Sequence, residues 1–150
     1  MQEHIQNELA SFIANCDWEK IAPHFKEDAA YRVLDWVGCA VAGEHYPQVE
    51  IAQKYFIENG DQGNSTVIGH QIKCSPRTAA FLNGIAGHVC ELDDGHRTAI
   101  GHPGSIAVPT ALALGEHLNA SGADVLKAVI LGYEVFSRLG RTVNPVSYTH

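Results

Sequence analysis

The sequence contains no run of lysine or arginine. Its 10 basic residues are outnumbered by 17 acidic ones, and the formal net charge at pH 7 is −7. A nucleic-acid-binding surface needs clustered positive charge to meet the phosphate backbone, so we expect no nucleic-acid partner. An anionic substrate would have to be held by local positive groups against the overall field. The candidate groups are Arg97, Arg138 and Arg141.

Long hydrophobic runs and paired cysteines are also missing. The longest apolar run, around VGCAVAG, is too short to span a bilayer, and the first residues lack the basic and apolar regions of a secretory signal. We therefore expect no membrane partner and a cytoplasmic location. The cysteines form no CxxC pair and mostly lie in apolar patterns, so we expect reduced thiols. They are Cys16, Cys39, Cys74 and Cys90.

Proline and charge are scarce enough to exclude a disordered chain. Only 6 of the 150 residues are prolines, 18% are charged and 45% are hydrophobic, which is typical of a folded globular protein. We find no internal repeat, low-complexity segment or linker, so we expect one domain over residues 1–150. The final segment, RTVNPVSYTH, has loop-like character. We therefore expect this domain to be incomplete.

Apolar spacing predicts an almost entirely helical domain. Stripes at offsets of three and four residues, bounded by prolines, serines and glycines, indicate amphipathic or buried helices. The predicted helices cover about residues 3–15, 28–43, 47–59, 76–92, 109–119 and 121–140. One alternating stretch, STVIGHQIKC, predicts a short β-hairpin near residues 65–73.

Local signals set several predicted helix ends. Val108 precedes a proline and is disfavoured from the α region, so we expect Pro109 to begin a helix. Ser121 with Asp124 resembles a capping box at the start of the last helix. We expect Gly140 to end that helix.

Residues 90–105, CELDDGHRTAIGHPGS, concentrate ionisable side chains between two predicted helices. Asp93, Asp94, His96 and His102 form a compact acid/base set there. Histidine has a reference pKa of about 6.5, which suits proton transfer near neutral pH, and a neighbouring carboxylate can orient its ring. The set therefore favours chemistry at a carbon acid.

Two other interpretations of this loop stay open. Asp93 or Asp94 can simply satisfy backbone donors at a turn, because aspartate is a common loop former. The loop and the preceding helix also contain plausible ligands for zinc or iron, although no HxxxH or HExxH pattern fixes their geometry. These ligands are His88, Glu91, Asp93, His96 and His102.

The segment from AAFLNGIAGHVCELDDGHRTAIGHPGS through ALGEHLNASGADVLKAVILGYEVFSRLGR closely resembles the signature region of the MmgE/PrpD family. This family includes 2-methylcitrate dehydratase, cis-aconitate decarboxylase and iminodisuccinate epimerase. The earlier VLDWVGCAVAG and the STVIG hairpin also match its N-terminal part. The resemblance implies an all-α domain that, in full-length relatives, joins a smaller α/β lid domain absent from this chain. It also implies an enzyme that acts on polycarboxylates without a metal or organic cofactor.

The resemblance further implies which residues act. In the decarboxylase and dehydratase branches an acidic residue lies two positions before the acidic pair, a threonine follows the pair, and a histidine opens the HPG-type turn. Those positions are Glu91, Gly95 and His102 here, so glutamate replaces the more familiar aspartate and the threonine hydroxyl is missing. Full-length relatives continue into a second histidine motif, a lysine and a lid-domain tyrosine. By this comparison the chain covers about the first third of a family member.

We expect His102 to act as acid and base, with nearby carboxylates orienting it and neighbouring groups holding the substrate. The predicted catalytic residues are His102, Asp93, Asp94 and Glu91. The predicted substrate-binding residues are His96, Arg97, Ser105 and Gly104. Arg97 can hold a carboxylate bidentately, and Gly104 lets an anion approach the backbone closely.

The leading functional prediction is dehydration of a 2-methylcitrate-like hydroxy polycarboxylate, begun by removing a proton α to a carboxylate. Epimerisation of the iminodisuccinate type and decarboxylation of cis-aconitate are alternatives, because each also needs an acid/base group at carbon. An alternative of another class is a non-catalytic module that needs a partner chain. We also expect the protein to form a homodimer.

Overall fold

The computed structural model describes residues 2–143 and confirms the expected all-α fold with one short hairpin. The end of the loop-like C-terminal segment, residues 144–150, lies outside the described residues. The elements are α1 (Gln2–Ala14), the 3-10 helix η1 (Trp18–Lys20), α2 (Pro23–Gly43), α3 (Pro47–Glu58), β1 (Ser65–Val67), β2 (Ile72–Cys74), α4 (Pro76–His88), α5 (Gly104–Leu118) and α6 (Gly122–Val143).

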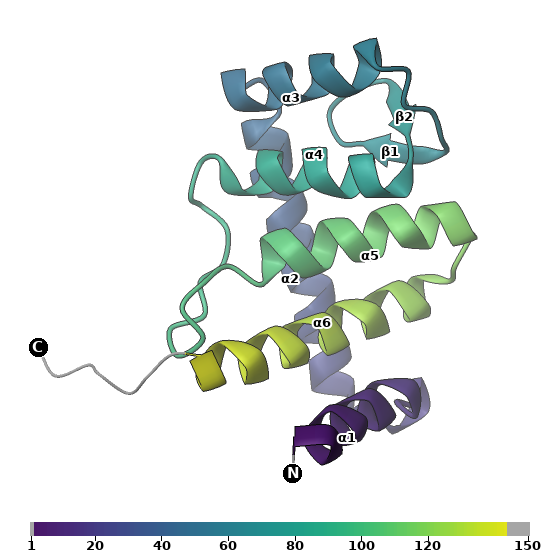
Figure 1. Cartoon of the computed structure of the whole chain (residues 1–150), viewed down its shortest axis with the longest axis vertical. Helices are drawn as coiled ribbons and strands as arrows, with labels where there is room; N and C mark the ends of the chain where they lie inside the picture. The colour runs from purple at the N-terminus through teal and green to yellow at the C-terminus, as the bar shows by residue number, and fades with distance from the viewer. Residues whose placement is uncertain (1, 144–150) are drawn as a thin grey trace, which may run out of the picture.

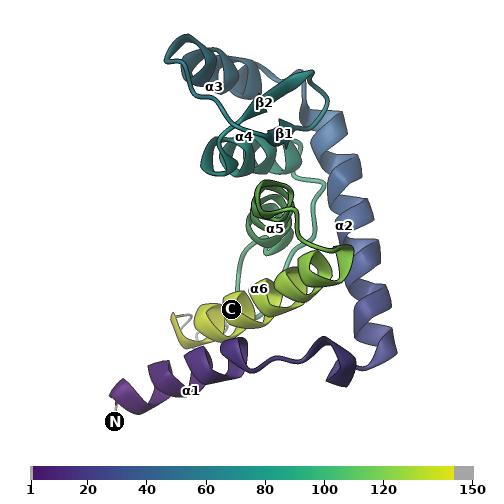
Figure 2. The same ribbon diagram turned by 90° about the vertical axis from the view of Figure 1, so that its right-hand side faces the viewer.

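Helix α2 forms the long axis of the domain, and α4, α5 and α6 are stacked along one side of it (Figures 1 and 2). Helix α5 lies between α4 and α6 and packs against both. Helix α3 and the antiparallel β1–β2 hairpin lie at one end of the stack, and α1 lies at the other. The loop between α4 and α5 therefore lies beside α2, close to the ends of the two helices that it joins.

Small side chains allow these helices to approach closely. The core between α2, α4, α5 and α6 contains Trp36, Ala40, Ala86, Val108 and Val129, all 3% exposed or less. Trp36 is the one large side chain among them. A Cβ atom on Gly87 would lie 2.4 Å from its indole Nε1, so the absence of a side chain at Gly87 makes room for the tryptophan.

Side chains of serine residues cap the starts of α4 and α6. The Ser75 side chain accepts a hydrogen bond from the backbone N–H of Thr78 at the start of α4. Before α6, the Asp124 backbone N–H donates to Ser121 Oγ, and that hydroxyl donates to the Asp124 carboxylate. The expected cap at Ser121 is therefore confirmed. Pro23 begins α2 five residues earlier than the apolar pattern indicated, because proline suits the first helical turn.

The expectation that Pro109 begins a helix is wrong, because α5 starts at Gly104 and contains Pro109 in its interior. Proline has no N–H, so the carbonyl of Ser105, one turn earlier, loses its helical donor. The buried Pro109 ring lies next to Gly84 of α4: its Cγ would be 3.8 Å from a Cβ at that position. Close packing of α4 on α5 thus outweighs the local cost of the proline.

Two other predicted helix ends are displaced. Helix α6 continues past Gly140 to Val143. Gly140 instead lets the α4–α5 loop approach, since a Cβ there would lie 2.5 Å from the Cβ of Ala99. Helix α4 ends at His88, before the predicted end near residue 92, and Glu91 adopts the left-handed φ of 50° that helical geometry excludes.

Within residues 2–143, no helix combines the length and the apolar character that crossing a membrane requires.

Candidate active site

The α4–α5 loop folds back on itself and is fixed to the start of α5 by Asp94. The His96 backbone N–H donates to the Gly101 carbonyl across an antiparallel bridge. The Asp94 carboxylate accepts a hydrogen bond from the Gly104 N–H at 3.0 Å and pairs with Arg32 Nη1 at 3.0 Å. Asp94 therefore caps α5 from ten residues away and connects the loop to α2.

Asp93 points the other way and is the buried centre of the site. Its side chain is 1% exposed, and its Oδ2 accepts a hydrogen bond from Ser105 Oγ at 2.6 Å. The indole Nε1 of Trp36 donates to the same Ser105 oxygen at 3.2 Å. A chain of hydrogen bonds from α2 through the first turn of α5 thus holds this carboxylate in place.

Two histidines meet on the Asp93 carboxylate. His88 Nδ1 lies 3.0 Å from Oδ1, and His102 Nδ1 lies 3.4 Å from Oδ2. The ring centroids of the two histidines are 4.6 Å apart. Within residues 2–143, the buried Nδ1 of His102 makes no hydrogen bond. One buried carboxylate therefore contacts two imidazoles, and the Nδ1 atom of His102 lacks a hydrogen bond in the described part of the chain.

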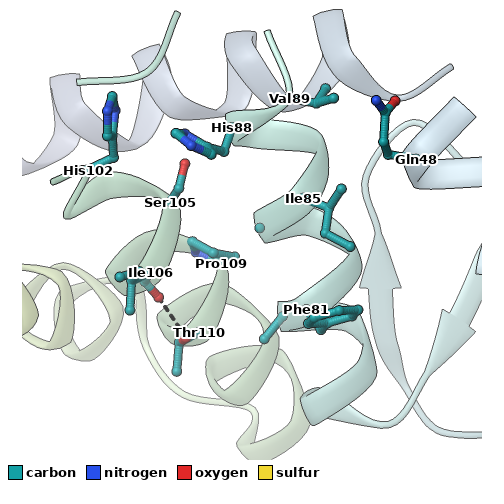
Figure 3. A pocket seen from close by; sticks show the side chains of 12 residues that line it. Gln48, Phe81, Ile85, His88, Val89, His102, Ser105, Ile106, Pro109 and Thr110 are labelled. Carbon is teal, nitrogen blue, oxygen red and sulfur yellow. Dashed lines mark hydrogen bonds between the residues drawn. The ribbon is translucent and has the colours of Figure 1, made fainter. Parts of the chain in front are cut away.

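Both imidazoles line a pocket of about 610 Å³ between α4 and α5. Figure 3 shows His88, His102 and Ser105 gathered at one end and Phe81 at the other. Between these ends the lining is mostly apolar, from Ile85, Ile106 and Pro109 among others. A pocket with a polar, titratable end and apolar walls is the usual form of a small-molecule site.

The other side of the loop forms a second polar cluster. Burial, reinforced by the nearby Asp94 carboxylate, raises the pKa of Tyr133 well above its ordinary value, so the phenol stays protonated. Arg32 lies over the Tyr133 ring, with its Cζ 5.0 Å from the ring centroid. Arg32 and Tyr133 line a different cavity of about 920 Å³, between the N-terminal segment, α2 and α6, and His96 also lines it.

The structure brings together some of the predicted site residues and separates others. Asp93, His102 and Ser105 meet at the pocket, whereas His96 lies at the second cavity. Glu91 and Arg97 are exposed on the loop. Asp94 and Gly104 form the cap of α5, and a Cβ on Gly104 would come within 2.5 Å of the Asp94 carboxylate. The catalytic and substrate-binding roles predicted for all of these residues stay predictions.

The sequence indicated His88 only as a possible metal ligand, and its hydrogen bond with Asp93 was not predicted. The available signal was its place in the last turn of a helix, five residues before the acid. Trp36 gave no such signal, because it is 69 residues from Ser105 in the chain. Of the five predicted metal ligands, the structure gathers His88, Asp93 and His102, with their ligand atoms within 4.8 Å of one another.

Comparison with known proteins identifies the family. Residues 7–150 match the model of the MmgE/PrpD N-terminal domain. A cis-aconitate decarboxylase-like protein, oryM, of Aspergillus oryzae is 31% identical over 144 residues, which cover 91% of this chain and 30% of that protein. A cis-aconitate decarboxylase of Aspergillus terreus is 31% identical over 144 residues, 93% of this chain and 29% of its own length.

The human cis-aconitate decarboxylase is 36% identical over 112 residues, covering 71% of this chain and 23% of that enzyme. The chain thus spans less than a third of the length of these curated relatives. With a family match that covers nearly every residue, the chain belongs to the MmgE/PrpD family and corresponds to its N-terminal domain.

Proposed function

We propose that the whole protein is a lyase that acts on a small polycarboxylate, with His102 transferring a proton at a carbon next to a carboxylate group. The observation that carries this proposal is the position of His102, beside the buried Asp93 at the polar end of an otherwise apolar pocket. The family supports the reaction class, because two of the relatives named above are cis-aconitate decarboxylases.

The two nitrogens of His102 have different roles in this proposal. Nδ1 faces the Asp93 carboxylate at 3.4 Å, so the acid fixes the orientation and the tautomer of the ring. Nε2 is then the atom that exchanges a proton with a bound ligand. Asp93 is itself held by Ser105, which keeps the geometry constant while the imidazole changes charge.

The reaction has two main candidates. In a decarboxylation, the loss of CO₂ leaves an electron pair on carbon that the imidazolium of His102 protonates. In a dehydration, neutral His102 removes the proton and hydroxide leaves from the adjacent carbon. The names of the relatives favour decarboxylation of a cis-aconitate-like acid. Dehydration of a 2-methylcitrate-like acid and epimerisation need the same proton transfer and are the alternatives.

The pocket itself offers few groups that can hold carboxylates. His88 lies at the same end as His102, and Gln48 contributes an amide from the start of α3. When protonated, His88 would supply positive charge next to the reacting carbon, and its Nδ1 lies 3.0 Å from the Asp93 carboxylate. We propose that His88 binds one carboxylate of the substrate. Catalysis without a metal or organic cofactor is part of the same proposal.

An assay of the whole protein tests the proposal. We would incubate it with cis-aconitate and with 2-methylcitrate in deuterated water, and follow CO₂ release and product deuteration by NMR. His102→Gln should lower turnover by about 10²–10⁴-fold, the usual cost of a lost general acid/base. His117→Gln, at the far end of α5 and hydrogen-bonded to Asn64, is the matched control and should retain turnover.

The outcomes separate the alternatives. CO₂ release with deuterium in the product would identify a decarboxylase, and an alkene product without CO₂ a dehydratase. Exchange with inverted configuration and neither product would identify an epimerase. A His102→Gln protein that kept turnover within about threefold of the unmodified protein would overturn the acid/base role. The predicted homodimer is tested separately by sedimentation velocity.

A further inference from the structure

We infer that His88, Asp93 and His102 form a binding site for a Zn²⁺ ion, and that the bound ion inhibits the protein. The two parts have different foundations. Metal binding follows from the positions of the three side chains. Inhibition rests on the proposed function of His102.

The distances from the Asp93 carboxylate to the two imidazoles match those of a zinc site. Zinc binds imidazole nitrogen and carboxylate oxygen at about 2.0–2.2 Å in tetrahedral geometry, which places neighbouring ligand atoms roughly 3.3 Å apart. Both histidine Nδ1 atoms lie close to the same Asp93 oxygen, Oδ2: that of His88 at 3.2 Å and that of His102 at 3.4 Å. All three ligand atoms lie within 4.8 Å of one another. Both separations from the carboxylate oxygen are therefore already close to those around a bound ion.

The site is prepared for a cation in two further respects. The His102 Nδ1 is buried and makes no hydrogen bond within residues 2–143, so no existing hydrogen bond is lost when it binds metal. Asp93 is fixed by the Ser105 hydroxyl at 2.6 Å, which is the kind of outer partner that orients a ligating carboxylate. The remaining ligand, His88, is the last residue of α4 and thus starts from a regular helix.

The ligand set also determines which metal is expected. Two imidazoles and one carboxylate suit zinc and other late transition metals, whereas magnesium and calcium prefer oxygen ligands alone. The pocket of about 610 Å³ that both imidazoles line has room for a water molecule as fourth ligand. Three protein ligands and one exchangeable position are typical of an accessible zinc site rather than a closed structural one.

Zinc at this site would prevent the proposed proton transfer. A histidine that binds a metal through Nδ1 keeps its proton on Nε2, so His102 could no longer accept one there. The ion would also occupy the Asp93 carboxylate that orients the ring. Because both imidazoles must be neutral to bind, zinc affinity should fall as the pH drops through the range in which histidine is protonated.

Calorimetric titration of the purified protein with Zn²⁺ and with Mg²⁺ tests the binding. We expect one equivalent of Zn²⁺ and no Mg²⁺ to bind at about pH 7.5, with weaker Zn²⁺ binding at about pH 5.5. His88→Gln and His102→Gln should each weaken Zn²⁺ binding by more than about tenfold, and Ser105→Ala, which leaves all ligands in place, by about 10–100-fold. His96→Gln and Glu91→Gln are the controls from the same loop and should bind Zn²⁺ like the unmodified protein.

A second measurement needs no variant and removes the question of misfolding. In the ¹⁵N-labelled protein, Zn²⁺ should shift the Nδ1 resonances of His88 and His102 and leave those of His96 and His117 in place. Unchanged resonances for the first pair would overturn the inference. So would His88→Gln and His102→Gln variants that fold by circular dichroism and bind Zn²⁺ as tightly as the unmodified protein.

Turnover of the whole protein separates this inference from the proposed function. We expect Zn²⁺ to inhibit turnover and a chelator to restore it. Zinc bound by these three residues with turnover unchanged would overturn the acid/base role of His102 and the inhibition, while the metal site would stand. Loss of turnover in His102→Gln without any zinc binding by the unmodified protein would overturn the metal site and support the proposed function.

Discussion

Trp36 and Ser105 are joined by a hydrogen bond of 3.2 Å from the indole Nε1 to the hydroxyl oxygen, across 69 residues of sequence. The same hydroxyl donates to Asp93 at 2.6 Å. The hydroxyl of this one serine thus connects helix α2 to the Asp93 carboxylate. Ser105 therefore acts on the position of the carboxylate, in addition to any direct contact with a ligand.

Ser105→Ala should destabilise the domain by about 1–3 kcal/mol, because it leaves the buried indole N–H of Trp36 without its acceptor and removes a donor from Asp93. Urea unfolding followed by tryptophan fluorescence measures the change. Ser11→Ala on the exposed face of α1 is the control and should change stability by less than about 0.5 kcal/mol. Equal stabilities for the two variants would contradict the proposed role of the hydroxyl.

Gly87→Ala should cost about 1–3 kcal/mol through overpacking. The new Cβ would lie 2.4 Å from Trp36 Nε1, so the indole must move and its hydrogen bond to Ser105 must lengthen. Gly38→Ala on α2 is the matched control, because a Cβ there meets nothing within 4 Å. We expect that control to stabilise the helix by about 0.5–1 kcal/mol. Thermal unfolding of both variants checks the opposite signs.

Asp94→Asn and Asp94→Ala separate the two roles of Asp94. Asparagine keeps an oxygen that can accept from the Gly104 N–H and loses only the ion pair with the partly exposed Arg32, which should cost about 0.2–1 kcal/mol. Alanine also removes the cap of α5, for a further loss of about 1 kcal/mol. Chemical denaturation measures the difference. Identical losses for the two variants would mean that the cap contributes nothing.

Glu116 predicts a specific sensitivity to acid. Partial desolvation raises its pKa, but hydrogen bonds from Lys73 and Thr66 outweigh that effect and hold the pKa below its ordinary value. A lowered pKa in the folded state stabilises the protein above the ordinary glutamate pKa of about 4.3, and this stabilisation is lost as the pH falls through the folded-state value. The melting temperature should therefore fall in that range.

Glu116→Gln should lower the melting temperature near neutral pH and flatten its dependence on acid, because glutamine cannot titrate. Glu58→Gln, at the end of α3 and paired only loosely with Lys54 at 3.7 Å, is the control and should follow the unmodified protein. Melting curves recorded between about pH 7 and pH 3 make the comparison. Parallel losses in the unmodified protein and Glu116→Gln would show that another group is responsible.

The sequence predicted the helices well where the signal is local. Ser121 caps α6 as expected, because a cap depends on residues three positions apart. The predicted helix start at Pro109 was wrong, because the preference of proline for helix starts is a local rule. The packing of Pro109 on Gly84 of α4 involves a distant segment of the chain. The expected end at Gly140 failed for the same reason, since the contact with Ala99 comes from the loop.

The candidate site also combines features that local sequence predicts with features that depend on contacts between distant segments. Asp93 and His102 are close in sequence, and the composition of their loop was enough to select them as acid/base candidates, whereas Ser105 was predicted to bind substrate. His96 and Arg97 look equivalent in the sequence, yet the backbone directs His96 to a different cavity and leaves Arg97 exposed. That separation depends on the bridge within the loop and on the fixation of Asp94, neither of which has a local sequence signature.

Glu91 and Ile100, which flank Asp93 and His96, have strained backbone conformations. Glu91 and Ile100 have φ angles of 50° and 46°, a conformation that is unfavourable by about 1 kcal/mol or more for residues other than glycine, and most of all for a β-branched one. Glycine at either position would relax the backbone and make the loop more permissive. The tension at Glu91 and Ile100 thus opposes folding locally, and neighbouring contacts must hold both residues in a shape that the free peptide would avoid.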